Sequence, residues 1–213
     1  YNMATLFVDK VDPQSGTTLE IGSSGDTVNL ASGATQSGFS NTVKLVDTSA
    51  SNASSVDVDG FFTSDYDTYI LYLHGIYNQT SAGNAIYARL NTGGSTITTS
   101  TYQSAAKGRY VESSGQGDLN FDYWNTDYIR VTYNSGNTLA TASFVQITIS
   151  NPLDTSTPKK ITWQETGNMN TTQYEYIGGG GQNTGTAALS GINIYGNSQN
   201  INVQKVLLYG VRS

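Results

Sequence analysis

The stretch Tyr69-Ile70-Leu71-Tyr72-Leu73 is apolar at every position, so a strand built from it presents apolar side chains to both sides of its sheet. Tyr, Ile, Val and Thr favour pleated surfaces, and the chain is rich in them. A strand that is apolar on both faces is typical of the middle of a covered sheet. The stretch therefore predicts a central strand of a β-sandwich.

Strands with apolar residues at every second position surround this stretch. They contain Ile129, Val131 and Tyr133; Val145, Ile147 and Ile149; Ile161 and Trp163; and Ile192 and Ile194. Turn-forming Gly and Asn separate them at 91–94, 134–137 and 196–197, and the tetraglycine 178–181 is predicted to be a turn or a place where another chain passes close by. About ten strands with such turns predict an all-β fold, an antiparallel two-sheet sandwich of jelly-roll type.

The composition agrees with this fold class and narrows the chemistry. Of the 213 residues 12% are charged, against about 25% in an average soluble domain, while Ser, Thr and Asn make up one residue in three. One His and no Cys leave little for nucleophilic catalysis or a transition-metal site. The net charge of −6 argues against nucleic-acid binding. No apolar run approaches the roughly 20 residues that span a bilayer, so no membrane insertion is expected.

A short repeat occupies the N-terminal part of the chain. Residues 18–25 (TLEIGSSG) are answered after nine residues by 27–33 (TVNLASG), and a fainter third copy follows at 42–45 (TVKL). Each copy predicts a very short strand closed by a Gly turn, which cannot bury its apolar residues within its own chain. We predict an intertwined fibre shaft in which other chains cover these residues, with a hairpin capping the next domain as the alternative. The packing residues would be Leu19, Ile21, Val28 and Leu30.

The repeat and the strand pattern divide the chain into three predicted parts. Residues 1–42 are expected to form the shaft or attachment segment. Residues 43–55 include a polar, Ser-rich stretch and are expected to be a flexible connector, and 56–213 are expected to form the β-sandwich.

Three stretches resemble a known group of proteins. Residues 12–28 (DPQSGTTLEIGSSGDTV) look like the shaft repeats of tail fibres and related virion proteins of bacteriophages, notably marine cyanophages. Residues 60–69 (GFFTSDYDTY) are similar to the segment that opens the β-sandwich domain of many phage structural proteins. Residues 189–195 with 206–211 resemble the final hairpin of that domain, although the hairpin usually carries glycines where this chain has residues 199–204.

This resemblance implies a non-enzymatic, homotrimeric structural protein on the surface of the phage particle. It implies attachment to other virion proteins, of tail or capsid, through the N-terminal segment, and it implies no cofactor. The predicted function is a surface fibre or tip that contributes to host attachment. A capsid decoration or head-fibre protein is the alternative, and a small glycan depolymerase using acids such as Asp118, Asp122 and Glu112 is a third possibility.

A crowded aromatic segment is the candidate contact with a host-surface glycan. Residues 122–128 (DYWNTDY) place Tyr123, Trp124 and Tyr128 beside Asp and Asn. Sugar binding uses flat ring faces flanked by hydrogen-bonding groups. The competing and commoner arrangement would bury Trp124 in the sandwich core with its N–H bonded to a loop carbonyl, as we expect for Trp163.

The single histidine and one pair of acids have ordinary explanations. His74 is predicted to be a hydrogen-bonded core or interface residue rather than a catalyst, because no Ser–His–Asp spacing accompanies it. Asp57 and Asp59 supply half of a calcium loop, but its remaining ligands are missing. They are weak candidates for a cation site, and turn formation is the expected role.

Overall fold

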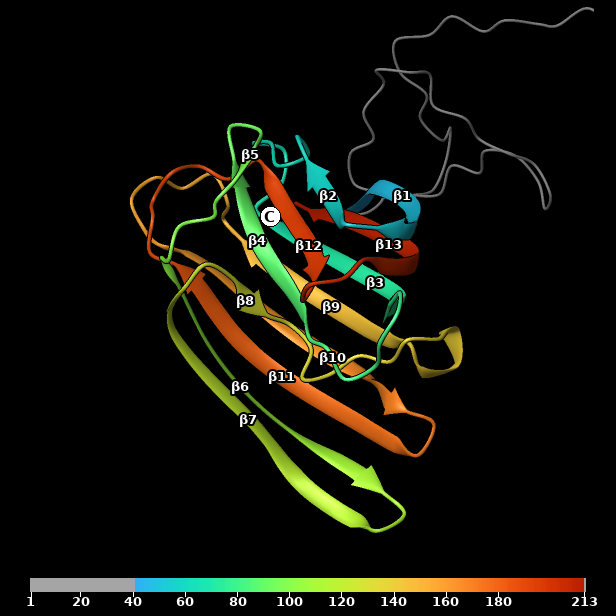
Figure 1. Ribbon diagram of the computed structural model, residues 1–213. Coiled ribbons are helices and arrows are strands. Elements are labelled where there is room, and N and C mark those ends of the chain that lie inside the picture. Colours follow the sequence, from blue (N-terminus) through green and yellow to red (C-terminus); the bar gives the residue numbers. More distant parts are fainter. Residues whose placement is uncertain (1–40, 213) are drawn as a thin grey trace, which may run out of the picture. The chain divides into compact units, whose positions relative to one another are not determined.

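The computed structural model describes residues 41–212, which fold into an antiparallel β-sandwich (Figure 1). These residues form thirteen strands and one short 3-10 helix, η1 (Leu139–Thr141). The predicted all-β sandwich is therefore confirmed. No helix between residues 41 and 212 combines the length and the apolar character required to traverse a bilayer.

Eight strands form the large sheet, and the small sheet is built around β4. The order of the large sheet is β1 (Thr42–Ala53), β13 (Ile201–Val211), β3 (Thr68–Asn78), β9 (Ser143–Ser150), β10 (Lys159–Asn170), β11 (Gln173–Asn183), β6 (Tyr102–Glu112) and β7 (Gly115–Thr126). The order of the small sheet is β2 (Ser55–Asp59), β12 (Gly191–Gly196), β4 (Ile86–Thr92) and β5 (Ser95–Thr96), with β8 (Ile129–Arg130) also paired to β4.

The strand order is that of a jelly roll. In a jelly roll of eight strands, one sheet takes the first, eighth, third and sixth strands and the other takes the second, seventh, fourth and fifth. Here β1, β13, β3 and β9 fill the first set, and β2, β12, β4 and β8 fill the second. The predicted jelly-roll type is thus present in the described part of the chain.

Two hairpins widen the large sheet beyond this pattern. The β6–β7 hairpin follows β4 and β5 in the chain, and the β10–β11 hairpin follows β9. The two hairpins pair with each other through β11 and β6, so they add four strands to one side of β9. We call β1, β13, β3 and β9 the jelly-roll half of the sheet, and β10, β11, β6 and β7 the added half. The β6–β7 hairpin reaches beyond the small sheet (Figure 1).

The predicted connector at 43–55 is wrong, because most of it forms strand β1. This strand pairs with β13 along its length, through a register with several bulges. Leu45, Val46 and Ala50 pack against the core, and the polar residues between them remain at the edge of the sheet. The sandwich therefore begins near Thr42 rather than at 56, since edge strands tolerate small polar residues and bulges.

The predicted final hairpin is also wrong. Strands β12 and β13 follow one another in the chain, but β12 pairs with β2 and β4 in the small sheet, and β13 pairs with β1 and β3 in the large sheet. The turn expected at 196–197 is present, and it carries the chain from one sheet to the other.

The core lies between the sheets and follows the predicted alternation. Trp163 is 2% exposed, as expected, and the central strand β3 buries Tyr69, Leu71 and Leu73 completely. The two sheets are also joined by hydrogen bonds, since the hydroxyl of Tyr102 on β6 accepts from the backbone N–H of Leu90 on β4 at 2.9 Å. Burial raises the pKa of Tyr102 to about 12.

The predicted shaft residues lie outside the described residues. The compact unit that contains the sandwich spans 40–213. The proposed packing of Leu19, Ile21, Val28 and Leu30 therefore stays a prediction.

Candidate functional site

The aromatic segment 122–128 does not form one patch, because Tyr123 and Trp124 are neighbours on a strand and point to opposite faces. Tyr123 is half-buried and turns towards the interior, where its hydroxyl accepts from Arg130 Nη1 at 3.0 Å. Its ring makes an edge contact with Tyr128, with centroids 5.6 Å apart, and Tyr128 stacks on Tyr87 at 4.2 Å. Tyr123 and Tyr128 therefore belong to a packed cluster rather than to an open glycan surface.

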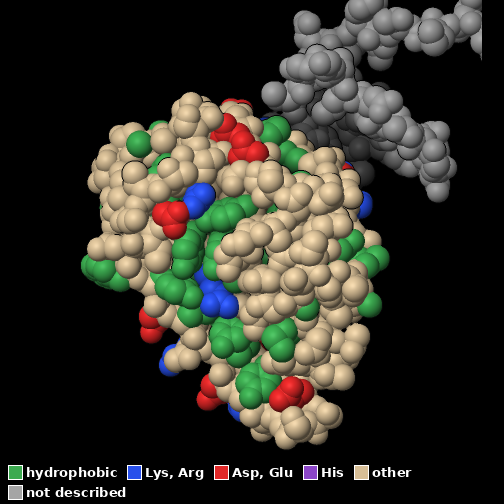
Figure 2. All heavy atoms as spheres, in the orientation of Figure 1, with side chains coloured by type: hydrophobic (Ala, Val, Ile, Leu, Met, Phe, Trp, Pro, Cys, Tyr) green, Lys and Arg blue, Asp and Glu red, His purple; other side chains and the backbone are tan. Residues whose placement is uncertain are grey.

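Two arginines, Arg130 and Arg89, hold this tyrosine cluster together. Arg130 contacts Tyr123, as described above. Arg89 lies 4.5 Å from the ring centre of Tyr195 and forms an ion pair with Asp127. Burial raises the pKa of Tyr195, although the neighbouring Arg89 lowers it. Figure 2 shows basic side chains set among hydrophobic ones on this side of the molecule. The contacts fix the small sheet to the β7–β8 connection, which is a structural role.

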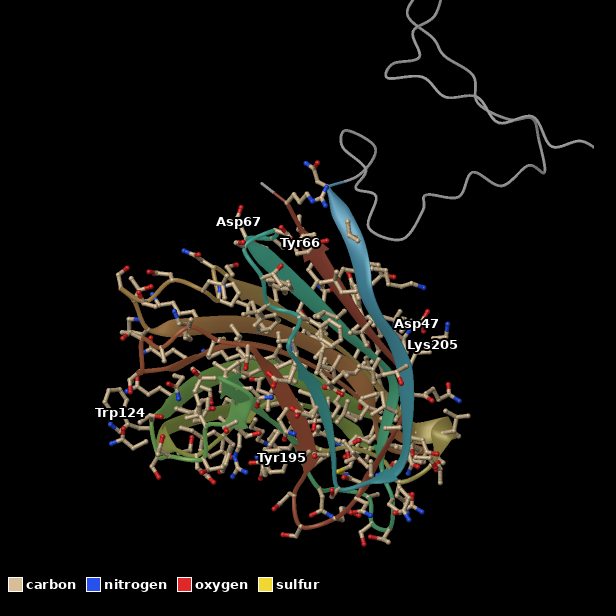
Figure 3. All side chains as sticks on the ribbon, turned by 90° about the horizontal axis from the view of Figure 1, so that it is seen from above. Asp47, Tyr66, Asp67, Trp124, Tyr195 and Lys205 are labelled. Atoms are coloured by element: carbon tan, nitrogen blue, oxygen red, sulfur yellow. The ribbon has the colours of Figure 1, made fainter. Side chains whose placement is uncertain are left out.

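Trp124 alone of the three candidates is open to solvent. It is 74% exposed, so burial in the core, the commoner arrangement, is wrong for this residue. Figure 3 shows it at one edge of the sandwich, far from Asp47 and Lys205. The position follows from strand alternation on β7, where Leu119 and Phe121 face the core and the residues between them face outward. An exposed indole face is therefore displayed at the end of the added half.

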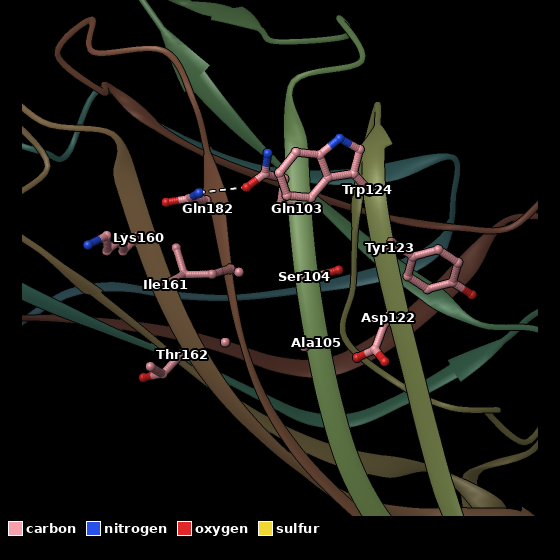
Figure 4. Close-up of a pocket in the computed structure, with 12 residues that line it drawn as sticks. Gln103, Ser104, Ala105, Asp122, Tyr123, Trp124, Lys160, Ile161, Thr162 and Gln182 are labelled. Atoms are coloured by element: carbon pink, nitrogen blue, oxygen red, sulfur yellow. Dashed lines mark hydrogen bonds between the residues drawn. The ribbon is translucent and has the colours of Figure 1, made fainter.

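A groove of about 640 Å³ starts at Trp124 and crosses the outer face of the added half (Figure 4). The strand register places its outward residues in two rows that run across the four strands. The first row is Lys160, Gln182, Gln103 and Trp124, and the second is Thr162, Gly180, Ala105 and Asp122. The groove thus has Lys, Gln, Thr and Asp side chains and one Trp ring along it and two small residues in the middle, and most of its lining surface is apolar.

The floor of the groove depends on the tetraglycine. Residues 178–181 form the second half of β11 and pair with both β10 and β6, so the predicted turn is wrong. A Cβ at Gly180 would come no closer than 3.8 Å to another atom, so the outer side of this residue is open. A Cβ at Gly179 would lie 2.5 Å from Trp163 Cζ2, because this glycine faces the packed core. The alternate glycines thus admit a core Trp on one side and expose bare backbone on the other.

Two amides are held in place on this floor. Gln182 Nε2 donates to Gln103 Oε1 at 2.7 Å, as the dashed line in Figure 4 marks. Each amide has two donor hydrogens and an acceptor oxygen, so both keep hydrogen-bonding capacity after this bond forms. Sequence reasoning did not find Gln103, Gln182, Lys160 or Thr162. Their signal is weak, since each is only a polar residue at an alternate position of a strand.

The acids considered from the sequence lie apart from one another. Asp122 lines the groove and is the one carboxylate among the residues between 41 and 212 that line it. Asp118 lies 3.4 Å from Arg109 as an exposed ion pair, and Glu112 accepts a hydrogen bond from Ser114. The structure does not bring these three acids together in one cleft.

Asp57 and Asp59 lie in strand β2, so the predicted turn or calcium loop is not formed there. The carboxylate of Asp57 accepts from Asn91 Nδ2 at 2.6 Å, which ties β2 to the rest of the small sheet. Within the described range 41–212, no group of three or more His, Asp and Glu side chains is placed to hold a metal ion.

Two buried acids were missed by the sequence analysis. Glu165 on β10 and Glu175 on β11 are 1% and 0% exposed. Burial raises the pKa of Glu175 to about 7, although the Asn134 N–H that it accepts at 3.0 Å and the nearby Arg130 lower it. Burial, and then the charge of Glu175, raise the pKa of Glu165 well above its usual range, although the side chain of Ser143 lowers it. Both acids face the core, on the opposite side of the sheet from the groove.

Comparison with protein-family models, with curated proteins and with solved structures gave no match for this chain.

Proposed function

We propose that the protein is a non-enzymatic structural component of a bacteriophage particle, a surface fibre or tip that helps to attach the particle to a host-surface glycan. The observation that carries this proposal is the exposed Trp124 at the end of a groove that has a glycine in its floor and amide side chains beside it. The resemblance of residues 12–28 to phage shaft repeats supplies the virion context.

The groove has the dimensions and the chemistry of an oligosaccharide site. Its rows cross four strands, and three spacings of about 4.8 Å give a length of about 14 Å, which accommodates two or three sugar rings. A sugar ring can stack on the indole of Trp124, and its hydroxyls can bond to the amides of Gln103 and Gln182. Lys160 and Asp122 add one charge of each sign, so the groove suits a neutral or zwitterionic glycan.

The lining favours binding over hydrolysis. Glycoside hydrolases use two carboxyl groups about 5–10 Å apart on either side of the scissile bond. In this groove Asp122 has no carboxylate opposite to it among the lining residues that the structure describes. The buried Glu165 and Glu175 cannot take that role, because substrate does not reach the core.

A homotrimer would make weak glycan contacts effective. Three grooves on one particle fibre multiply a modest affinity through avidity. Jelly-roll domains also occur in viral capsids and lectins, which is compatible with this function but does not by itself imply it. Labelling intact particles with an antibody would locate the protein on the tail or on the capsid. A capsid location would mean that the protein is a capsid decoration or head-fibre protein and not a tail fibre or tip.

The test is binding of a panel of neutral, zwitterionic and acidic bacterial-surface oligosaccharides to the full chain. We expect a hit that shifts the intrinsic fluorescence and whose affinity is weakened about fivefold by Trp124→Ala, because the stacking of one ring is worth about 1 kcal/mol. Tyr176→Ala, on the same sheet face but outside the groove, is the control and should bind as the wild type does. Equal losses in both variants, or binding untouched by Trp124→Ala, would refute the groove as the site.

A further inference from the structure

The outer face of the jelly-roll half carries an apolar patch. The patch consists of Ile70 and Tyr72 on β3, Phe144 on β9, and Leu207 and Tyr209 on β13, and these residues line a hollow of about 420 Å³. Each of them alternates with residues that face the core, so their side chains leave the sandwich on the outside. All five are half-buried by one another.

Such a patch is unusual on a face that meets solvent. The outer face of an antiparallel sheet is normally polar when water covers it. Here the rings instead pack on each other, with centroids 5.9 Å apart for Tyr72 and Phe144 and also for Tyr72 and Tyr209. His74 joins them, with its ring 4.8 Å from that of Phe144. Aromatic side chains on an apolar face are typical of the centre of protein–protein interfaces.

We propose that this patch binds a second copy of the chain and forms the contact between sandwiches in the assembly. This inference rests on the proposed homotrimer and assigns the surface that the sandwich contributes to it. The partner is another copy because of where the N-terminal segment joins. Residues 1–40 lead directly into β1, and Thr42, at its start, lines the same hollow.

The consequence of that junction is a high local concentration. If the repeats at 18–33 hold chains together, the sandwiches of those chains are tethered through Asn41, whose carbonyl accepts the N–H of Arg212 at 2.8 Å. A short tether raises the effective concentration of one sandwich near another into the millimolar range. A patch of modest size then suffices for docking.

The charges around the patch also favour a second copy. Lys44 and Asp47 on β1 form an exposed ion pair at 2.7 Å, and Lys205 on β13 acts on the same carboxylate. The rim thus carries both signs, which allows it to meet an identical rim without net repulsion. A strongly acidic or strongly basic partner would not meet a rim of uniformly opposite charge there.

The location of the patch leaves the glycan groove free. Asp47 and Lys205 lie at the opposite edge of the sandwich from Trp124 (Figure 3). The groove lies on the added half and the patch on the jelly-roll half of the same sheet, so the two surfaces are built from different strands. None of the described residues that line the patch also lines the groove, so association through the patch uses none of the groove's side chains.

The first test compares two pairs of substitutions on the same sheet face in the full chain. Tyr72→Ser with Tyr209→Ser removes rings from the patch, and Val111→Ser with Tyr176→Ser removes exposed apolar side chains from the added half as a control. We expect sedimentation velocity to show self-association weakened at least tenfold in the first variant and less than twofold in the second. Circular dichroism would verify that both are folded. Equal behaviour of the two variants would overturn the proposal.

The experiments distinguish an error in the patch proposal from an error in the proposed homotrimer. If Leu19→Asp with Val28→Asp dissociates the protein but Tyr72→Ser with Tyr209→Ser does not, the homotrimer stands and the patch proposal is wrong. If the wild-type chain is a monomer at every concentration, both are wrong.

A cysteine probe identifies the occupant, because the chain has no Cys of its own. In the Leu207→Cys variant a flexible bis-maleimide should join two chains and labelling should be slow, whereas Tyr176→Cys should label quickly without joining chains. Slow labelling of Leu207→Cys without any joined chains would mean that the protein's own N-terminal segment covers the patch. That result would overturn the assignment to a second copy.

Discussion

The two halves of the large sheet share one continuous hydrogen-bonded ladder but are built for different surroundings. In the jelly-roll half, β3 is apolar on both faces, with Leu71 inside and Tyr72 outside. In the added half, the outer face carries amides, Thr and a glycine floor, and the inner face carries two buried carboxyl groups. One half is suited to being covered on both sides, and the other to a polar ligand outside.

The difference shows that the jelly roll and its insertions carry separate tasks. Both halves of the large sheet contribute to the core, but the jelly-roll strands alone present the surface that we assign to assembly. The inserted hairpins β6–β7 and β10–β11 supply every outward residue of the groove. An insertion between existing strands can therefore add a binding surface without altering the original sheet order.

The largest expected effect concerns the buried acids of the added half. Glu165 and Glu175 titrate near 4.5 when the chain is unfolded, while burial raises the folded pKa of Glu175 to about 7. Between these values the unfolded chain has released protons that the folded chain still holds, so the stability present below pH 4.5 is lost as the pH rises towards 7. For Glu175 alone the loss is about 3 kcal/mol of unfolding free energy.

Glu165→Gln with Glu175→Gln should remove this decline, so that the unfolding free energy no longer falls because of the inner face of the added half. Urea unfolding of the wild type and of the double variant at pH 5 and pH 8 measures the difference. Glu112→Gln, which changes a half-buried acid at the end of β6, is the control and should keep the wild-type slope. Parallel curves for the wild type and the double variant would contradict the prediction.

The second effect contrasts the two sides of β11. Gly179→Ala should destabilise the fold by about 2 kcal/mol, because the methyl group would press on Trp163 and on the backbone oxygen of Ala105. Gly180→Ala should leave stability nearly unchanged, since its methyl group enters open space, but it should weaken glycan binding by raising the groove floor. Urea unfolding and oligosaccharide titration of both variants check this, and equal destabilisation would show that the two faces of β11 do not differ as described.

The smallest effect is expected on the solvated outer surface of the added half. Arg109 and Asp118 form an ion pair at 3.4 Å while 62% and 86% of their side chains are exposed. Asp118→Asn should therefore leave the unfolding midpoint unchanged within error, because water screens such a pair. A clear shift in the thermal unfolding midpoint would mean that this surface is covered. The outer faces of the two halves would then not differ in their exposure to solvent.

Much of the fold could be predicted from local pattern. The apolar stretch 69–73 indicated a central strand, the alternation around Trp163 indicated a buried ring, and the turns at 91–94 and 196–197 are present. These succeed because side-chain alternation and turn chemistry depend only on residues close together in the chain. The turn predicted at the tetraglycine is wrong, because glycine occurs both in turns and in strands that pass close to a large side chain.

The sequence by itself determined that this is an all-β chain with an N-terminal repeat and an aromatic segment at 122–128. Only the tertiary structure decided that Trp124 is exposed and Tyr123 packed, that β12 and β13 join different sheets, and that Glu165 and Glu175 are neighbours in the core. Alternation tells which residues share a face of a strand, but not which face is covered or which strand lies beside it. Those depend on pairing between segments far apart in the chain, as when β11 meets β6 and creates the groove.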